Sequence, residues 1–355
     1  MSPARWLVLG VLLAASLGVQ SLGLDSGEEM KLEEKYRRVA DIPATDMVPT
    51  YVASLFFGAF RAVVVDALWI QLKKIEEEHR WYEQRQTIQL ISYFQPRNPE
   101  VWAHLGWHSA YNIANGFTDP EKSWDWVKFG LKWLREGNSR IPDSPYLKFE
   151  LARTLYFKPT WRGGYLERDL LSRIENDKEL QGILNPGPPS ARPLSAFELA
   201  VPWLERGREE LLKRTPPYVI TQTGLYIRPL TLDGFMREAL YYQAIYLWQQ
   251  KRWEEAKEAF QRLTDHTHAI VQREYKSDFK SPIFADEEKW SARIPEIIDL
   301  DRKAEGGSRE AELALLAKLQ SLVIEFGALD RGFFCNRERG DGRLDRLKRK
   351  LSGNQ

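Results

Sequence analysis

A glutamate and two histidines follow one another at intervals of four residues, at Glu100, His104 and His108. On a helix this spacing places the three side chains on one side, and two histidines with a carboxylate are a ligand set that transition metals use. The segment HLGWH lacks the glutamate of the HExxH pattern, so it offers no metalloprotease base. Neighbouring segments supply no obvious fourth ligand. We therefore predict packing histidines and no metal, with these three residues as a weak metal candidate and His266 with His268 as a weaker one.

The sequence contains no recognisable catalytic motif. It has no G-x-S-x-G, no histidine-paired cysteine and no glycine-rich phosphate loop, and Cys335 is its only cysteine. We predict that the protein is not an enzyme and binds no cofactor. The alternative is a cell-envelope enzyme that cleaves wall glycan, similar to the α-superhelical lytic transglycosylases, for which Glu150 and Glu167 are the available acids. The strands of a lysozyme-like domain are not visible in the sequence.

Aromatic side chains recur at positions that would line the concave face of stacked helix hairpins. Exposed aromatics in a groove commonly anchor peptides or flat sugar faces. The alternative is that these side chains fill a thick core. Because aromatic residues make up 12% of the chain, more than such hairpins need, we predict a partner-binding groove. Its residues are Trp107, Tyr111, Tyr241, Ile245 and Trp248.

The elements that would position these residues are pairs of helices. Between Trp81 and Gly106 the spacing is helical, the segment QPRNP breaks it, and Trp102, Leu105 and Gly106 open a new helix. The segment from Leu240 to Leu263 has the same kind of packing positions. Those positions are Leu240, Ala244, Trp253, Ala256 and Phe260.

Small residues explain how two helices of a pair approach each other. Gly106 and Ala110 leave the space that a large residue of the partner helix fills. Each pair keeps an uncovered apolar face, so the pairs must stack into an array. Gln84, Gln243 and the late Pro142 depart from the regular pattern, which indicates degenerate repeats.

This pattern resembles the tetratricopeptide repeat, with its W-x2-L-G and A-x3-F positions. In addition, AFRAVVVDALWI followed by FQPRNPEVWAHLGWHSAYNIA is similar to a group of uncharacterised bacterial membrane-anchored proteins with tetratricopeptide-like repeats. The similarity covers Tyr51 to Leu155. It implies an α-helical fold and a place at the membrane, and it implies no particular activity.

The apolar stretch from Tyr51 to Ile70 contains two charges, Arg61 and Asp66. Each costs roughly 2.5 to 3.5 kcal/mol near the centre of a membrane helix. We therefore predict a core helix rather than a second membrane span. In such a helix both charges need partners, as a buried ion pair or a hydrogen-bonded cap, and docking onto a membrane-embedded partner is the functional alternative.

The N-terminal region has the features of a membrane-targeting sequence. Arg5 precedes an apolar run from Trp6 to Leu24, and acidic residues follow it. This order favours an inside N-terminus with the remainder exported. A cleaved signal and a retained anchor both fit, and the length of the run favours the anchor. With 51 Lys and Arg against 50 Asp and Glu, the chain has no overall field that would attract nucleic acid.

The sequence divides into six predicted segments. They are a signal anchor or transmembrane helix over 1–25, a stem over 26–50, a tetratricopeptide-like block over 51–160, an irregular Pro- and Gly-containing insertion or linker over 161–232, a second block over 233–330, and a basic tail over 331–355. In the tail, Leu344, Leu347 and Leu351 share one helix face. Contact with an anionic membrane or a partner and a frayed, solvated end are both open.

These observations predict an all-α fold, a tetratricopeptide-like α-solenoid of helix hairpins tethered by a single N-terminal helix. The bulk of the chain would lie on the periplasmic, extracytoplasmic side. The predicted function is a scaffold that binds a partner protein, within a membrane complex, through the aromatic groove.

Overall fold

The computed structural model describes residues 61–160, 167–188, 190, 192–221, 224–274, 282–326 and 342–352. The chain divides into two compact units, Met1–Ile70 and Gln71–Gln355. Helix α4 (Arg61–Glu77) crosses this boundary. The predicted anchor and stem, residues 1–50, lie outside the described residues. Among the helices that are described, none combines the length and the apolar character that a bilayer crossing requires.

Most of the described chain is helical and only two short strands are present in it, which confirms the prediction of an all-α fold. After α4 come α5 (Trp81–Phe94), α6 (Pro99–His108), the π-helix η2 (Ser109–Ile113), α7 (Pro120–Arg140), α8 (Pro145–Phe157), the 3-10 turn η3 (Lys158–Thr160), α9 (Arg168–Asn176), α10 (Lys178–Leu184) and α11 (Ala196–Leu212). Two short strands, β1 (Val219–Ile220) and β2 (Tyr226–Ile227), separate these from α12 (Pro229–Gln249), α13 (Trp253–Glu274), α14 (Pro282–Ser291), α15 (Ile294–Glu305), α16 (Arg309–Glu325) and α17 (Arg343–Ser352).

Side-chain caps fix where several helices begin. Asn98 accepts a hydrogen bond from the Glu100 amide at 3.1 Å, and Pro99 occupies the first turn, where its missing N–H costs nothing. Ser308 caps α16 in the same manner, as its sequence position predicts. Ser195 closes a reciprocal capping box at the start of α11. The starts of these helices are therefore set by local sequence.

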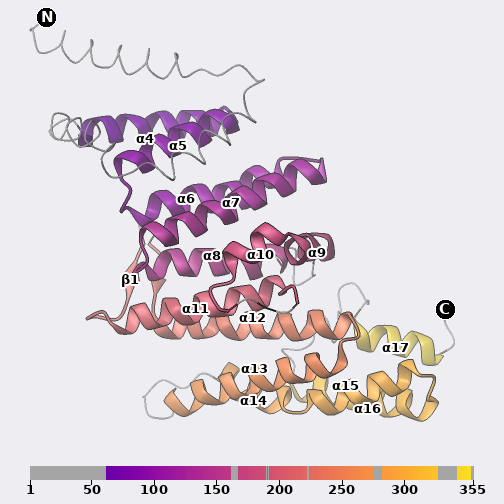
Figure 1. Cartoon of the computed structure of the whole chain (residues 1–355). Coiled ribbons are helices and arrows are strands. Elements are labelled where there is room, and N and C mark those ends of the chain that lie inside the picture. The colour runs from indigo at the N-terminus through magenta and orange to yellow at the C-terminus, as the bar shows by residue number, and fades with distance from the viewer. Residues whose placement is uncertain are drawn as a thin grey trace, which may run out of the picture. The chain divides into compact units, whose positions relative to one another are not determined.

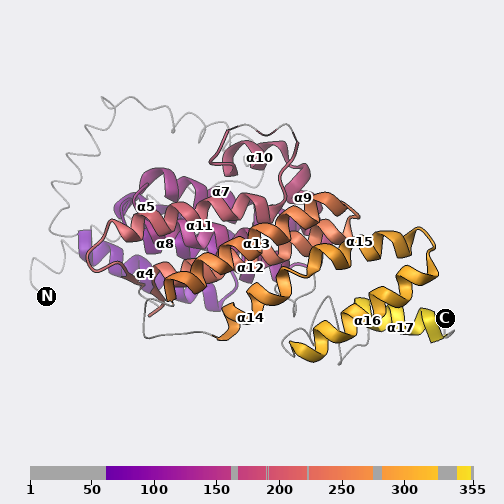
Figure 2. The same cartoon turned by 90° about the horizontal axis from the view of Figure 1, so that it is seen from below.

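Within the unit Gln71–Gln355, most helices pack on the next one along the chain. Contacts join α5 to α6, α6 to α7, α7 to α8, α12 to α13, α13 to α14, and α15 to α16. Figures 1 and 2 show these neighbours side by side. Helix α11 packs on both α8 and α12. The segment 161–232, predicted as an insertion or linker, therefore contributes one helix to the packed series.

Small residues bring α6 and α7 close together. A Cβ atom placed on Gly130 would lie 2.6 Å from the carbonyl oxygen of Gly106 and 3.1 Å from the Cβ of Ala110. Gly106 in turn faces the side chain of Leu134. The close approach expected for Gly106 and Ala110 is thus present, and its partner surface is α7.

The residues predicted to pack the repeats are mostly buried. Only one member of the set is half-buried, Trp253 at the start of α13. The buried members are Trp102, Leu105, Gly106, Leu240, Ala244, Ala256 and Phe260. Most of this set therefore belongs to the hydrophobic core, and Trp253 lies at its edge.

The C-terminal helix packs on the protein itself. Leu344 and Leu347 are buried, and α17 contacts α16. Arg343 forms an ion pair with Asp301, and Lys350 forms one with Glu312. Residues 343–352 are therefore neither a frayed end nor a free amphipathic face for a membrane.

The predicted buried ion pair in α4 is wrong for Asp66. Asp66 is exposed, so its charge needs no buried partner. Arg61 is the first residue of α4, and its side chain lies outside the described residues. Val63 and Ile70, three residues before and four after Asp66, are also exposed, whereas Val65 is buried, so Asp66 lies on the exposed side of the helix.

Candidate functional site

The structure overturns the predicted aromatic groove at three of its five positions. Tyr111, Ile245 and Trp248 are each 2% exposed, so a partner cannot contact them. Trp107 and Tyr241 are half-buried and pack on other aromatics, Trp107 on Tyr111 and Tyr241 edge-on to a tryptophan of α14. These side chains fill a thick core, which was the alternative interpretation of the pattern.

Tertiary contacts explain this burial. The Tyr111 hydroxyl donates a hydrogen bond to the carbonyl oxygen of Arg153 at 3.3 Å, and the Lys158 ammonium lies 5.4 Å from the Tyr111 ring centroid. The Trp248 indole donates to the Asp301 carboxylate at 2.8 Å. Each aromatic ring therefore meets polar partners from a helix distant in sequence, and those partners satisfy it inside the protein.

The two histidines of α6 meet a carboxylate, and it is Glu76 rather than Glu100. His104 Nε2 lies 2.8 Å from Glu76 Oε1, and His108 Nε2 lies 3.9 Å from the same oxygen. The Gln84 amide nitrogen donates to Glu76 Oε1 and to His108 Nδ1, both at 3.1 Å. Because Nδ1 accepts this hydrogen bond, the proton of the neutral imidazole is on Nε2, facing Glu76.

Burial sets the charges of this cluster. It lowers the pKa of His108 to about 4, despite the opposing attraction of Glu76. Burial works to raise the pKa of Glu76, but the hydrogen bond from His104 and the charges of both histidines outweigh it, and the pKa is lowered. At neutral pH the cluster therefore contains an ionised Glu76 and a neutral His108.

Glu100 takes no part in this cluster. It lies instead beside Tyr146 and Glu150, whose ionisation it disfavours. Within the described ranges, no group of three His, Cys, Asp or Glu side chains is arranged to hold a metal ion. Glu100, His104 and His108 therefore do not come together as a ligand set, because the carboxylate beside the two histidines is Glu76 of α4.

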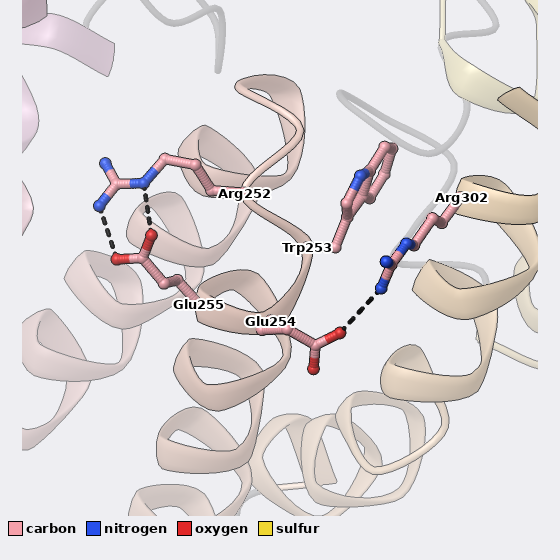
Figure 3. A pocket seen from close by; sticks show the side chains of 5 residues that line it. All are labelled: Arg252, Trp253, Glu254, Glu255 and Arg302. Atoms are coloured by element: carbon pink, nitrogen blue, oxygen red, sulfur yellow. Dashed lines mark hydrogen bonds and ion pairs between the residues drawn. The ribbon is translucent and has the colours of Figure 1, made fainter. Parts of the chain in front are cut away.

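A surface pocket of about 250 Å³ lies at the turn between α12 and α13, facing α15. Figure 3 shows the indole of Trp253 standing between two ion pairs, Arg252 with Glu255 on one side and Arg302 with Glu254 on the other. One part of Trp253 packs on the core, and the rest lines the pocket. The pocket thus combines a half-buried aromatic surface with charges of both signs.

A tight turn positions the pocket residues. The amide of Arg252 bonds to the carbonyl of Leu247 and that of Lys251 to the carbonyl of Trp248, both at 3.0 Å, which is the Schellman pattern at the end of α12. Lys251 has a φ of 59°, in the left-handed region that usually takes glycine. The turn ends α12, holds Arg252 over Glu255, and starts α13 with Trp253.

Both pocket carboxylates contact basic side chains. Arg252 Nη2 lies 2.6 Å from Glu255 Oε2, and this hydrogen bond lowers the pKa of Glu255. Arg302 Nη1 lies 3.1 Å and Lys257 Nζ 2.8 Å from the two oxygens of Glu254. A general acid for glycan cleavage needs a raised pKa, and the pKa of Glu255 is shifted in the opposite direction.

The acids proposed for the glycan-cleaving alternative do not form a site. Glu150 is 3% exposed and forms an ion pair with Arg153 at 2.6 Å. Burial raises the pKa of Glu150, but no polymer can reach a carboxylate that is enclosed in this way. Glu167 lies at the N-terminal end of α9, in a different part of the chain.

Sequence reasoning missed four of the five residues that line the pocket. Trp253 was assigned to repeat packing, and Arg252, Glu254, Glu255 and Arg302 were not singled out. The adjacent residues RWEE, with two opposite charges around a tryptophan, were the available signal for three of them. Nothing local marks Arg302, because α15 brings it to the pocket from nearly fifty residues away.

Comparisons with protein-family models, with curated proteins and with solved structures find no match to this chain.

Proposed function

We propose that this protein is a membrane-tethered, tetratricopeptide-like scaffold that holds a partner protein, and that the partner inserts a side chain beside Trp253. The observation that carries the proposal is the pocket of Figure 3, in which a half-buried tryptophan is flanked by two arginines. Tryptophan and arginine are the residue types most enriched at the energetic centres of protein interfaces.

The size of the pocket favours a protein partner over a small ligand. Sites for drug-sized molecules and cofactors enclose about 300 to 1,000 Å³. The pocket at Trp253, with about 250 Å³, falls below that range and is bordered by charge on two sides. It accommodates one or two side chains of a partner whose remaining surface would lie on the adjoining helices.

The charges favour a partner that carries both signs. Arg252 and Arg302 are each paired with a glutamate of the same pocket, so the site has no excess of either charge. Acidic groups of a partner would compete for the arginines, and basic groups for the glutamates. This balance disfavours nucleic acid, which binds surfaces with a strong positive excess.

The architecture proposed for the scaffold is an α-solenoid. The supporting observation is that the helices of the unit Gln71–Gln355 pack mainly on their neighbours in sequence, as in repeat arrays. The run from Trp6 to Leu24 would supply the tether, with the bulk of the chain on the periplasmic side.

Site-specific photo-crosslinking in the full chain tests the docking site. A photoreactive phenylalanine derivative replaces the exposed Glu254, and a control places it at Glu205, which is exposed on α11. Detergent extracts should give a stoichiometric crosslinked partner at position 254 and none at position 205. Equal crosslinking at both positions would refute a site at Trp253.

A tryptophan truncation gives the energetic test with the identified partner. Removing a central interface residue costs about 2 kcal/mol or more, so Trp253→Ala should weaken binding roughly 30-fold. Trp124→Ala is the matched control, because Trp124 is likewise half-buried against the core but lies on α7. A similar Kd for the two variants would show that Trp253 only packs.

A further inference from the structure

The C-terminal helix α17 contacts the helix that supplies one wall of the Trp253 pocket. Its first residue, Arg343, forms an ion pair with Asp301 of α15. The Arg343 guanidinium also lies 3.5 Å from Glu305, one turn further along α15. Arg302 lies between these two acids in the sequence, and Figure 3 shows it opposite the indole of Trp253.

Asp301 connects α17 to the end of α12. Its carboxylate is 2% exposed. The indole of Trp248, at the end of α12, donates to Asp301 Oδ2 at 2.8 Å, and Arg343 Nε donates to the same oxygen at 3.2 Å. Among the described side chains, Arg343 is the only basic one that pairs with Asp301. Because a buried carboxylate that loses its cation is strongly unfavourable, the position of Asp301 depends on Arg343.

Glu305 connects the same helix to the turn that shapes the pocket. Lys251 Nζ lies 2.7 Å from Glu305 Oε2, and this hydrogen bond lowers the pKa of Glu305. The charge of Arg343 lowers it further. Lys251 directly precedes Arg252 and Trp253 in the chain. The two acids of α15 therefore bind α17 on one side and the turn between α12 and α13 on the other.

Apolar packing fixes the first half of α15 more firmly than its last turn. Ile294, Ile297 and Ile298 are each at most 1% exposed. The last turn contributes only the small Ala304 to the core. The position of this turn therefore depends mainly on the ion pairs of its two acids, and the same turn carries the pocket arginine.

The docking of α17 rests on a small number of contacts. Leu344 and Leu347 are buried, and α17 packs on α16, beside which Figures 1 and 2 show it. Arg343 and Lys350 add the ion pairs at the two ends of the helix. A helix of this length is unstable in water by itself, so α17 stays helical only while these contacts hold it. Its docking is an equilibrium that a ligand can shift.

We propose that α17 completes the binding site at Trp253, with Arg343 as the residue that positions Arg302. The docked helix holds the last turn of α15, so that Arg302 stays 3.1 Å from Glu254 and borders the pocket. This inference rests on the proposed function of the pocket. The partner would bind tightly only while α17 is docked, and by linkage the bound partner would stabilise the docked state by the same factor.

Fluorine NMR of the full chain in detergent tests the positioning role without a partner. The protein is labelled with 5-fluorotryptophan, and three Trp→Phe variants assign the signals of Trp248, Trp253 and Trp124. Arg343→Gln should shift the signals of Trp248 and Trp253 and leave that of Trp124, on α7, in place. A shift of all three signals would indicate a general loss of structure and would overturn a local role.

The matched control is Lys318→Gln. Lys318 Nζ lies 2.6 Å from Glu296 Oε2, so this variant also removes an ion pair to α15, but at the opposite end of that helix. It should leave the Trp253 signal unchanged. If it shifts Trp253 as much as Arg343→Gln does, α17 has no specific role.

A double-mutant cycle separates positioning from simple loss of α17. In an Asp301→Asn background no buried charge needs a cation, so adding Arg343→Gln should shift the Trp253 signal much less than it does in the parent. Arg343→Lys, which keeps the charge, should largely restore the parent signal. Equal shifts by Arg343→Gln in both backgrounds would overturn the link through Asp301.

Crosslinking from position 254 then tests the link to the partner. Arg343→Gln should reduce the crosslinked product at least about five-fold, a typical size for coupling between sites, and Lys318→Gln should not. Normal crosslinking in Arg343→Gln would overturn this inference and leave the docking site intact. Absence of the product in the parent would instead refute the docking site, and the fluorine signals alone would then decide whether Arg343 positions Arg302.

Discussion

Removal of the His108 imidazole should change how the stability of the protein depends on pH. The pKa of His108 is lowered to about 4 by burial, from an ordinary value of 6.5. The folded state therefore resists protonation of His108 while the unfolded state accepts it. The contribution of His108 to the free energy of unfolding is therefore fully present above about pH 6.5 and is lost as the pH falls toward 4.

The size of this effect follows from the two pKa values. Between pH 7 and pH 5, linkage gives a loss of about 2 kcal/mol for a histidine with these values. Glu287 acts in the opposite direction over the same range, because burial raises its pKa to about 7. The difference between the parent protein and His108→Gln, rather than the parent curve alone, therefore isolates His108.

Two measurements check this prediction in the full chain. Histidine-selective ¹³C NMR should show one of the five imidazoles titrating near pH 4, and this signal should vanish in His108→Gln. Guanidinium unfolding followed by tryptophan fluorescence should then show that the variant loses about 2 kcal/mol less than the parent between pH 7 and pH 5.

If the His108 signal titrates near its ordinary value, or if His108→Gln and the parent lose equal stability on acidification, the reasoning from burial is refuted.

Two further substitutions test the packing of the helices. Gly130→Ala should destabilise the protein by about 1 to 3 kcal/mol, because the new Cβ would lie 2.6 Å from a backbone oxygen of α6. The control is Gly234→Ala, whose new Cβ would have no atom within 4 Å, so this substitution should stabilise α12 by up to about 1 kcal/mol. Equal midpoints in guanidinium would contradict the close approach. Trp248→Phe should cost about 2 kcal/mol, since Asp301 loses a buried hydrogen bond of 2.8 Å. Trp124→Phe serves as its control, and a larger loss in the control would show that aromatic volume, not the hydrogen bond, matters.

Local sequence predicted the helical class and several helix starts. Asn98 with Pro99, and Ser308, act through hydrogen bonds and backbone restrictions that reach only a few residues, so their effect is visible without a fold. Gly106 was also recognised as a point of close helix contact, because an absent side chain within a helical pattern has few other uses. The surface that it meets, on α7, was not evident.

The functional surfaces were less accessible to sequence reasoning. Tyr111 and Trp248 were predicted to line a groove because their spacing matches a repeat, yet contacts from Arg153 and Asp301 enclose them. Burial depends on what lies opposite a side chain, and spacing within one helix does not specify the opposite surface. For the same reason, the spacing within α6 did not reveal that the carboxylate beside His104 is Glu76 of α4 and not Glu100.

The sequence by itself determined an all-helical chain with capped helices, small residues at a helix contact, and an apolar N-terminal run. Only the tertiary structure decided that Trp253 borders a pocket, because one of its charged walls, Arg302, comes from a distant helix. Helix formation depends on bonds between residues three or four positions apart, and these are written in the local sequence. A site requires side chains from separate helices at one place, and the packing of those helices alone sets that.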